Sequence, residues 1–158
     1  MTTNKDAHEM MLEHHLGLVE NVSTYVEALS QTVSDLSKYQ DAKSRLVDYL
    51  RNEVLPHALA EENTIYLAAT SIAYLAEVVK EMTSEHQELL SATKSLALTA
   101  SPTQATKLAK SIQTFFVSHV AKENEVLLPA LVADNSVNLA QLLVEMHGEM
   151  LKVRPVLL

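Results

Sequence analysis

Two short stretches of the sequence contain the same pair of chemically capable residues. HALAEENTIY begins at His57 and places Glu61 four residues later, and HVAKENEVLL begins at His119 and places Glu123 at the same spacing, 62 residues further along. Residues four apart lie on one face of an α-helix, so each pair presents an imidazole nitrogen and a carboxylate in one direction. These donors together suit Fe, Zn, Mn, Ni or Cu better than Mg or Ca, which prefer all-oxygen ligand sets.

Both pairs lie in stripes of apolar residues that recur with the helical period. In the predicted helix that precedes each pair, one histidine also lies in such a stripe, and we call it the seam histidine. The neighbouring stripe positions are Leu46, Leu50, Val54 and Ile65 in one copy and Leu108, Ile112, Phe116 and Leu127 in the other. The residues predicted to face the interior are His15, His57, Glu61, His86, His119 and Glu123. A single histidine in such a stripe is more often a hydrogen-bonded core residue, but two buried carboxylates are costly without a counter-charge. The set therefore predicts a metal site.

The number of donors favours two metals over one. If Glu61 and Glu123 both bridge two metals, each metal receives two histidine nitrogens and two carboxylate oxygens. A bridging oxo or hydroxo group adds a fifth donor and leaves about one position of an octahedral iron for O₂, peroxide, NO or water. An open position of this kind is the condition for reactivity. The spacing assigns no catalytic residue and no cofactor site beyond the metal ligands.

The elements that must position these residues are long helices. The sequence has only two glycines and four prolines, which favours helix. Its periodic apolar stripes predict helices over about residues 5 to 36 and 41 to 68, and a third along the stripe from Ile72 to Leu96. A fourth helix is predicted to begin at Ser101 and Pro102 and to end near Pro129. A shorter fifth helix is expected over 137–151. Pro56 should kink or widen the second helix beside His57.

We expect an all-α fold, an up-down antiparallel four-helix bundle with a short fifth C-terminal helix. Residues 1–158 form one domain in this prediction, with two helical hairpins over about 5–68 and 70–131 and the C-terminal helix over 137–151. Each hairpin contributes one seam histidine and one His-x-x-x-Glu pair to the same interior. The fold thus repeats one ligand arrangement twice.

Composition excludes several classes of function. The chain contains no cysteine, so any metal must use nitrogen and oxygen ligands, and disulfides and iron–sulfur clusters are excluded. The formal charge of -8 disfavours binding to nucleic acid or to an anionic membrane. The start of the chain has no apolar signal segment, and no apolar run is long enough to span a membrane. We expect a cytoplasmic protein whose partner is a small diatomic or peroxide ligand, with any protein partner unknown.

Four motifs in order resemble the hemerythrin-like (HHE cation-binding) family: DAHEMMLEHHLGL, LPHALAEENTIY, SEHQELL and HVAKENEVLLPAL. The resemblance covers essentially the whole chain. It implies an up-down bundle around two non-haem iron ions joined by an oxo or hydroxo bridge. Carried onto this sequence, it implies a ligand set of His15, His57, Glu61, His86, His119 and Glu123.

The sequence departs from the family's better-known members at points that bear on function. Oxygen-carrying hemerythrins have a second histidine four residues after the position of His86, where this chain has Leu90, and they end the last motif with an aspartate five residues on, where Glu123 follows His119 by four. Iron-sensing relatives carry a carboxylate where this chain has Ala58, and relatives that repair iron–sulfur clusters carry a cysteine-bearing segment. Simple O₂ storage is therefore disfavoured.

Several uses of such a centre stay open from the sequence. The first is a di-iron protein that binds or reacts with O₂, H₂O₂ or NO, which includes a peroxide-consuming, catalase-like enzyme. The alternative is a non-enzymatic iron-binding module that senses iron or oxygen. A ferritin-like oxidase is less favoured, because the first and third predicted helices have histidine where that architecture has glutamate.

The residues around the proposed ligands have separate expectations. The sequence does not decide whether His8, His14, His147 or a tyrosine joins the site in place of the histidine missing at Leu90. We expect the tyrosines in the core, and a solvated helix face for Glu13, Glu62 and Glu85.

Overall fold

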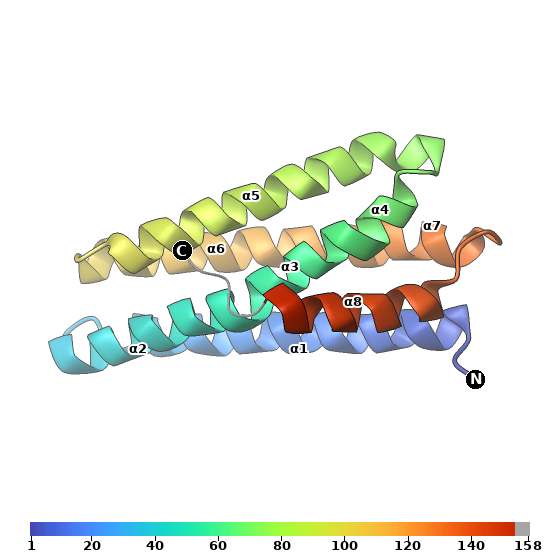
Figure 1. Ribbon diagram of the computed structural model, residues 1–158. Helices are drawn as coiled ribbons and strands as arrows, with labels where there is room; N and C mark the ends of the chain where they lie inside the picture. The colour runs from blue at the N-terminus through green and yellow to red at the C-terminus, as the bar shows by residue number, and fades with distance from the viewer. Residues whose placement is uncertain (154–158) are drawn as a thin grey trace.

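The computed structural model describes residues 1–153 and is helical throughout, with no strand in that range (Figure 1). The first helix is α1 (Asn4–Ser30). The second long segment comprises α2 (Leu36–Tyr49), the π-turn η1 (Leu50–Val54), α3 (Leu55–Glu61), the π-turn η2 (Glu62–Tyr66) and α4 (Leu67–Ala69). A 3₁₀ turn, η3 (Ala73–Leu75), leads into α5 (Ala76–Leu98). The last segments are α6 (Pro102–Lys122), the π-turn η4 (Glu123–Leu127), α7 (Leu128–Ala133) and α8 (Leu139–Val153). The all-helical prediction is confirmed.

Side-chain caps explain where the helices begin. Thr3 and Asp6 form a capping box at the start of α1, with the Thr3 hydroxyl accepting from the Asp6 amide at 3.1 Å. Ser101 caps α6 ahead of Pro102, as the sequence predicts. Asp35 caps α2 by accepting a hydrogen bond from the Lys38 amide at 3.2 Å.

The cap at Asp35 lies between two helices whose predicted boundaries are wrong. The first helix ends at Ser30 instead of about residue 36, and the second begins at Leu36 instead of about residue 41. Val33 and Leu36, which the sequence assigned to the buried stripe of the first helix, are 39% and 63% exposed. The chain reverses in the turn between these helices, so the stripe stops at Leu29.

Three π-turns widen the helices beside the predicted ligands. In η1 the Leu55 amide donates to the Leu50 carbonyl, one residue beyond the normal helical partner, directly before Pro56. The Leu128 amide donates to the Glu123 carbonyl in the same way, directly before Pro129. This local widening accommodates a proline inside a helix. The expected widening at Pro56 is confirmed, and the prediction that the fourth helix ends near Pro129 is wrong because the helix continues to Ala133.

The apolar core consists of two clusters. One cluster contains residues such as Leu18, Leu50 and Leu89, and the other contains Met11, Ile65 and Met82. On each of the four long segments, the chain passes from one cluster to the other where the predicted histidines and glutamates lie. The buried polar side chains therefore form a layer between two apolar ends.

The helix α8 packs against α1, α3 and η2, and Figure 1 shows it lying along α1. Asn4 fixes the connection, since its side chain donates to the Val137 carbonyl and accepts from the Leu139 amide, both at 2.8 Å. No helix within residues 1–153 is long and apolar enough to span a membrane.

Candidate metal centre

The six predicted site residues come together in the middle of the helical bundle. His15 lies on α1, His57 and Glu61 on α3, His86 on α5, His119 on α6, and Glu123 begins η4. Each of these six residues is at most 4% exposed. Four helical segments therefore contribute imidazole or carboxylate groups to one water-excluded layer.

The four histidines form two close pairs through their Nε2 atoms. The Nε2 atoms of His15 and His57 are 3.2 Å apart, and those of His86 and His119 are 2.9 Å apart. The first pair joins α1 to α3, and the second joins α5 to α6. We call them the His15–His57 pair and the His86–His119 pair.

The two glutamates lie between these pairs and face both. Glu61 places Oε1 at 2.9 Å from His57 Nε2 and at 3.2 Å from His15 Nε2, and Oε2 at 3.7 Å from His86 Nε2. Glu123 places Oε1 at 3.1 Å from His119 Nε2 and Oε2 at 3.5 Å from His15 Nε2. Each carboxylate thus directs one oxygen toward each histidine pair.

The outward Nδ1 atoms of the histidines have partners of their own. His86 Nδ1 donates to Glu62 at 2.8 Å, and His119 Nδ1 donates to Glu85 at 2.6 Å. This corrects the expectation that Glu62 and Glu85 line a solvated face, since both are partly buried against the site; Glu13 is exposed as expected. Glu85 also pairs with Lys122. Such contacts fix the ring orientation and raise the basicity of a ligating histidine.

The His15–His57 pair has uncharged partners instead. His15 Nδ1 lies 2.6 Å from the side-chain oxygen of Asn124, and His57 Nδ1 lies 3.1 Å from His14 Nε2. His14 keeps an exposed side, but desolvation of its ring, together with the neighbouring imidazoles of His57 and His15, lowers its pKa to about 4. His14 therefore supports a predicted ligand without facing the site itself.

The donor set suits a cation. Because carboxylates only accept hydrogen bonds, His86 and His119 carry protons on Nδ1, and their Nε2 atoms, 2.9 Å apart, would repel each other if both rings were neutral. A proton or a metal ion between such atoms removes this repulsion. One donor atom from each of Glu61, His86, His119 and Glu123 lies within 4.8 Å of the others, and the same holds for His15, His57 and Glu61. These groups could hold a metal.

Protons compete for the same atoms within the protein. Burial lowers the pKa of His15, but hydrogen bonding and charge from Glu61 and Glu123 outweigh burial and raise it to about 9. Burial opposes charge at His119 in the same way, and Glu123 and Glu85 raise its pKa to about 9. Burial favours neutral Glu61, yet His57 and His15 hold its pKa well below the usual range. A metal must displace these protons.

Tyr66 lies at the site, although the sequence predicted it only as one of the core tyrosines. Its hydroxyl donates to Glu123 Oε1 and lies 3.3 Å from both His86 Nε2 and His119 Nε2. Burial, followed by the charges of Glu123 and Glu61, raises its pKa well above the usual range. The π-turn η2 brings residues five apart toward one face, so Tyr66 falls on the side of Glu61. A π-turn beside a ligand is the signal that could have identified it.

The other residues singled out from the sequence lie away from this layer. His147 is exposed on α8, and His8 is partly buried, with no partner for its Nε2 among the described residues. Leu90 packs against the apolar cluster of Leu18 and Leu89. Tyr66 therefore supplies a polar group at the His86–His119 pair, where the chain lacks the second histidine.

The all-helical bundle and its buried histidine and glutamate cluster define a helical domain that could hold a metal. The chain matches the Hemerythrin HHE cation binding domain over residues 6–131, and it belongs to that family. The match ends before α8. Comparison with curated proteins and with solved structures gave no match.

Proposed function

We propose that the chain is a non-haem di-iron protein that binds or reduces a small oxidant, namely O₂, H₂O₂ or NO. The observation that carries this proposal is that Glu61 and Glu123 each direct one carboxylate oxygen toward each histidine pair. Such an arrangement suits two bridged metal ions. In this proposal, His15 and His57 would hold one ion, His86 and His119 would hold the other, and both glutamates would contact both.

The protein's own groups set the conditions for this chemistry. Two iron ions, when bound, would supply the redox chemistry and an open coordination position for the oxidant. The two apolar clusters exclude water from either side of the layer, and the Nδ1 partners fix the four rings. Tyr66 adds a hydroxyl oxygen at the His86–His119 pair, which makes the two ends of the centre unequal. Membership of the hemerythrin family favours iron among the metals that suit this donor set.

The fold that we propose around this centre is the up-down antiparallel four-helix bundle, with residues 1–158 forming one domain. Figure 1 supports it, since the long segments lie alongside one another and the chain turns back between them. A cytoplasmic location and a small-molecule partner, without nucleic acid or membrane, fit the formal charge of -8 and the absence of cysteine.

Metal analysis with optical spectroscopy tests this function. Purified protein loaded anaerobically with ferrous iron should contain about two irons per chain, and H₂O₂, O₂ and NO should be added in separate runs while spectra are recorded. Glu61→Ala and Glu123→Ala should lose paired loading, whereas Glu125→Ala, an exposed control in η4, should keep it. Normal loading of two irons in both ligand variants would overturn the bridging assignment. Inertness toward all three oxidants would overturn the reactivity.

A non-enzymatic metal-responsive module is the second candidate. The observation that favours it is the position of the polar layer between the two apolar clusters, because metal bound there would stabilise the whole bundle. This function predicts a large rise in melting temperature on loading, with no consumption of O₂ or H₂O₂. Turnover of either oxidant would exclude it.

A further inference from the structure

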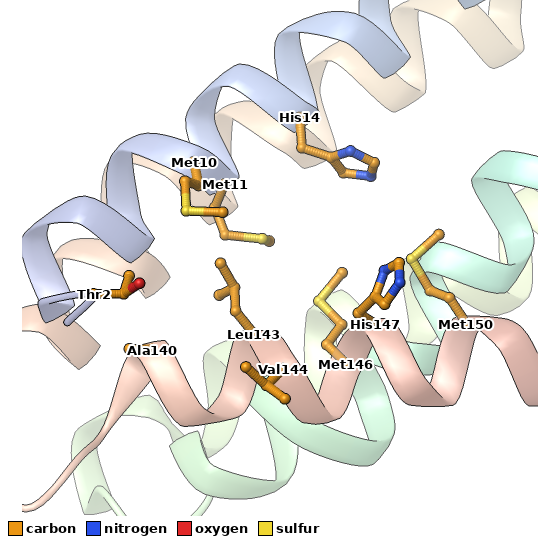
Figure 2. Close-up of a pocket in the computed structure, with 10 residues that line it drawn as sticks. All are labelled: Thr2, Met10, Met11, His14, Ala140, Leu143, Val144, Met146, His147 and Met150. Atoms are coloured by element: carbon orange, nitrogen blue, oxygen red, sulfur yellow. The ribbon is translucent and has the colours of Figure 1, made fainter.

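A cavity of about 460 Å³ lies outside the metal centre, between α1 and α8 (Figure 2). Its walls are mostly apolar, with four methionine thioethers among them, and two imidazole rings also line it. These side chains come from Met10, Met11, His14, Met146, His147 and Met150. The volume falls in the range of small-molecule sites, which is roughly 300 to 1,000 Å³.

The composition of the walls identifies a chemical class of ligand. Thioether sulfurs make favourable contacts with the edges of aromatic rings, and methionine side chains adapt to the shape of the ligand that they contact. His14 and His147 supply polar groups on the two opposite walls, one from each helix. Imidazoles can hydrogen-bond a hydroxyl or carbonyl oxygen. A small aromatic molecule that carries oxygen substituents matches both features.

The cavity is connected to the metal centre by a single side chain. His14 lines the cavity, and its Nε2 atom lies 3.1 Å from Nδ1 of His57, whose Nε2 belongs to the His15–His57 pair. The other three site histidines have Asn124, Glu62 or Glu85 at this position, none of which lines the cavity. A molecule bound in the cavity is therefore one imidazole away from a predicted ligand.

We propose that this cavity binds a small hydroquinone, which serves as the electron donor to the metal centre. The proposal rests on the proposed di-iron function. A hydroquinone that loses two electrons and two protons becomes a quinone, and two ferric ions held by the six predicted ligands would accept those two electrons. Conversion of one H₂O₂ and two protons to two waters would consume the same two electrons. One wall of the cavity, α8, lies beyond the family match at residues 6–131.

Methionine methyl NMR of the metal-free protein tests binding independently of any reaction. The chain has six methionines, and four of them line the cavity, while Met1 is exposed at the terminus and Met82 is buried in the core. Titration with methylhydroquinone should shift the signals of Met10, Met11, Met146 and Met150 and leave Met1 and Met82 unchanged. No shift at millimolar probe would overturn the proposal, as would shifts produced only by a soft cation such as Cu(I).

A pair of variants tests the donor role. Val144→Trp places a large side chain in the cavity from an exposed position on α8, and Val117→Trp is the matched exposed change on α6 outside it. Val144→Trp should weaken probe binding about tenfold or more and slow anaerobic reduction of the ferric protein by methylhydroquinone, measured as quinone formed. Val117→Trp should do neither. Equal reduction rates in the two variants would overturn the donor role, and failure to load two irons would count against the proposed function while the NMR result stands.

Discussion

The two histidine pairs each bring two Nε2 atoms together, but their surroundings differ. Around the His86–His119 pair, both outward nitrogens donate to carboxylates, and Tyr66 adds a hydroxyl. Around the His15–His57 pair, the corresponding partners are an amide and an imidazole. The negative charge beside the first pair favours a bound cation there, whereas His14 connects the second pair to the cavity under α8.

The sequence repeat explains why the two histidine pairs occupy similar positions but have different hydrogen-bond partners. Glu62 follows Glu61 as Asn124 follows Glu123, and each contacts a histidine on another helix. His14 and Glu85 likewise precede His15 and His86 and fill equivalent places. The duplicated pattern sets the positions of the rings, and the residue next to each ligand sets the local charge. Under the proposed function, we therefore expect two metal positions that differ in affinity, with the His86–His119 pair loading first.

The largest expected effect is the response of the metal-free protein to alkaline pH, in which the two pairs should behave alike. His15 and His119 each have a folded pKa of about 9, above the ordinary histidine pKa of 6.5, so their stabilisation is complete below about pH 6.5 and is lost as the pH rises through 9. The free energy of unfolding should fall by on the order of 3 kcal/mol for one such group acting alone. Urea unfolding between pH 6.5 and 9.5 measures it. The lowered pKa of Glu61 acts only in acid, outside this window, and a flat profile would contradict the prediction.

The next effect separates the pairs by their carboxylate partners. Glu62→Gln and Glu85→Gln remove the charge that supports the His86–His119 pair, and each should weaken metal binding there by about 10-fold to 100-fold. Glu88→Gln, an exposed change on α5, is the control. Competition titrations with a chelator would measure the two affinities. If the loading of the two pairs stays as unequal in both variants as in the original protein, the carboxylate partners do not cause the difference.

A smaller effect concerns the hydroxyl that only one pair has. Tyr66→Phe leaves Glu123 Oε1 without its phenolic donor and should lower the stability of the metal-free protein by about 1 to 2 kcal/mol. Tyr39→Phe is matched, because Tyr39 is also buried but its hydroxyl has no partner within residues 1–153. That change should be neutral. Equal losses in the two variants, measured by urea unfolding, would show that the contact with Glu123 contributes nothing.

The smallest effect should come from making the pairs more alike. Asn124→Asp gives His15 a carboxylate partner of similar size and should raise the metal affinity of the His15–His57 pair by up to about tenfold. The measurement is the ratio of the two binding constants, which should approach one. Asn63→Asp, at an exposed position on η2, controls for added charge. A ratio that moves equally in both variants would point to general electrostatics.

Sequence periodicity located the six residues of the inner layer but not the groups around them. His15 and Glu123 could be predicted because each continues an apolar stripe, and burial follows from the stripe. Glu62 and Glu85 could not, because the helical register turns them away from their own ligand and toward a histidine on the neighbouring helix. Tyr66 was missed because a π-turn, which α-helical spacing does not include, brings it to the site.

The polar layer between the two apolar clusters has a consequence for how long the folded chain survives in a cell. Each cluster packs only its own end of the bundle, and the histidines and glutamates join the ends across the middle. Under the proposed function, iron would hold these ends together, and its loss would allow the middle to open while both ends stay packed. Opening of that kind exposes backbone to proteases, so the abundance of the protein would follow the supply of the metal.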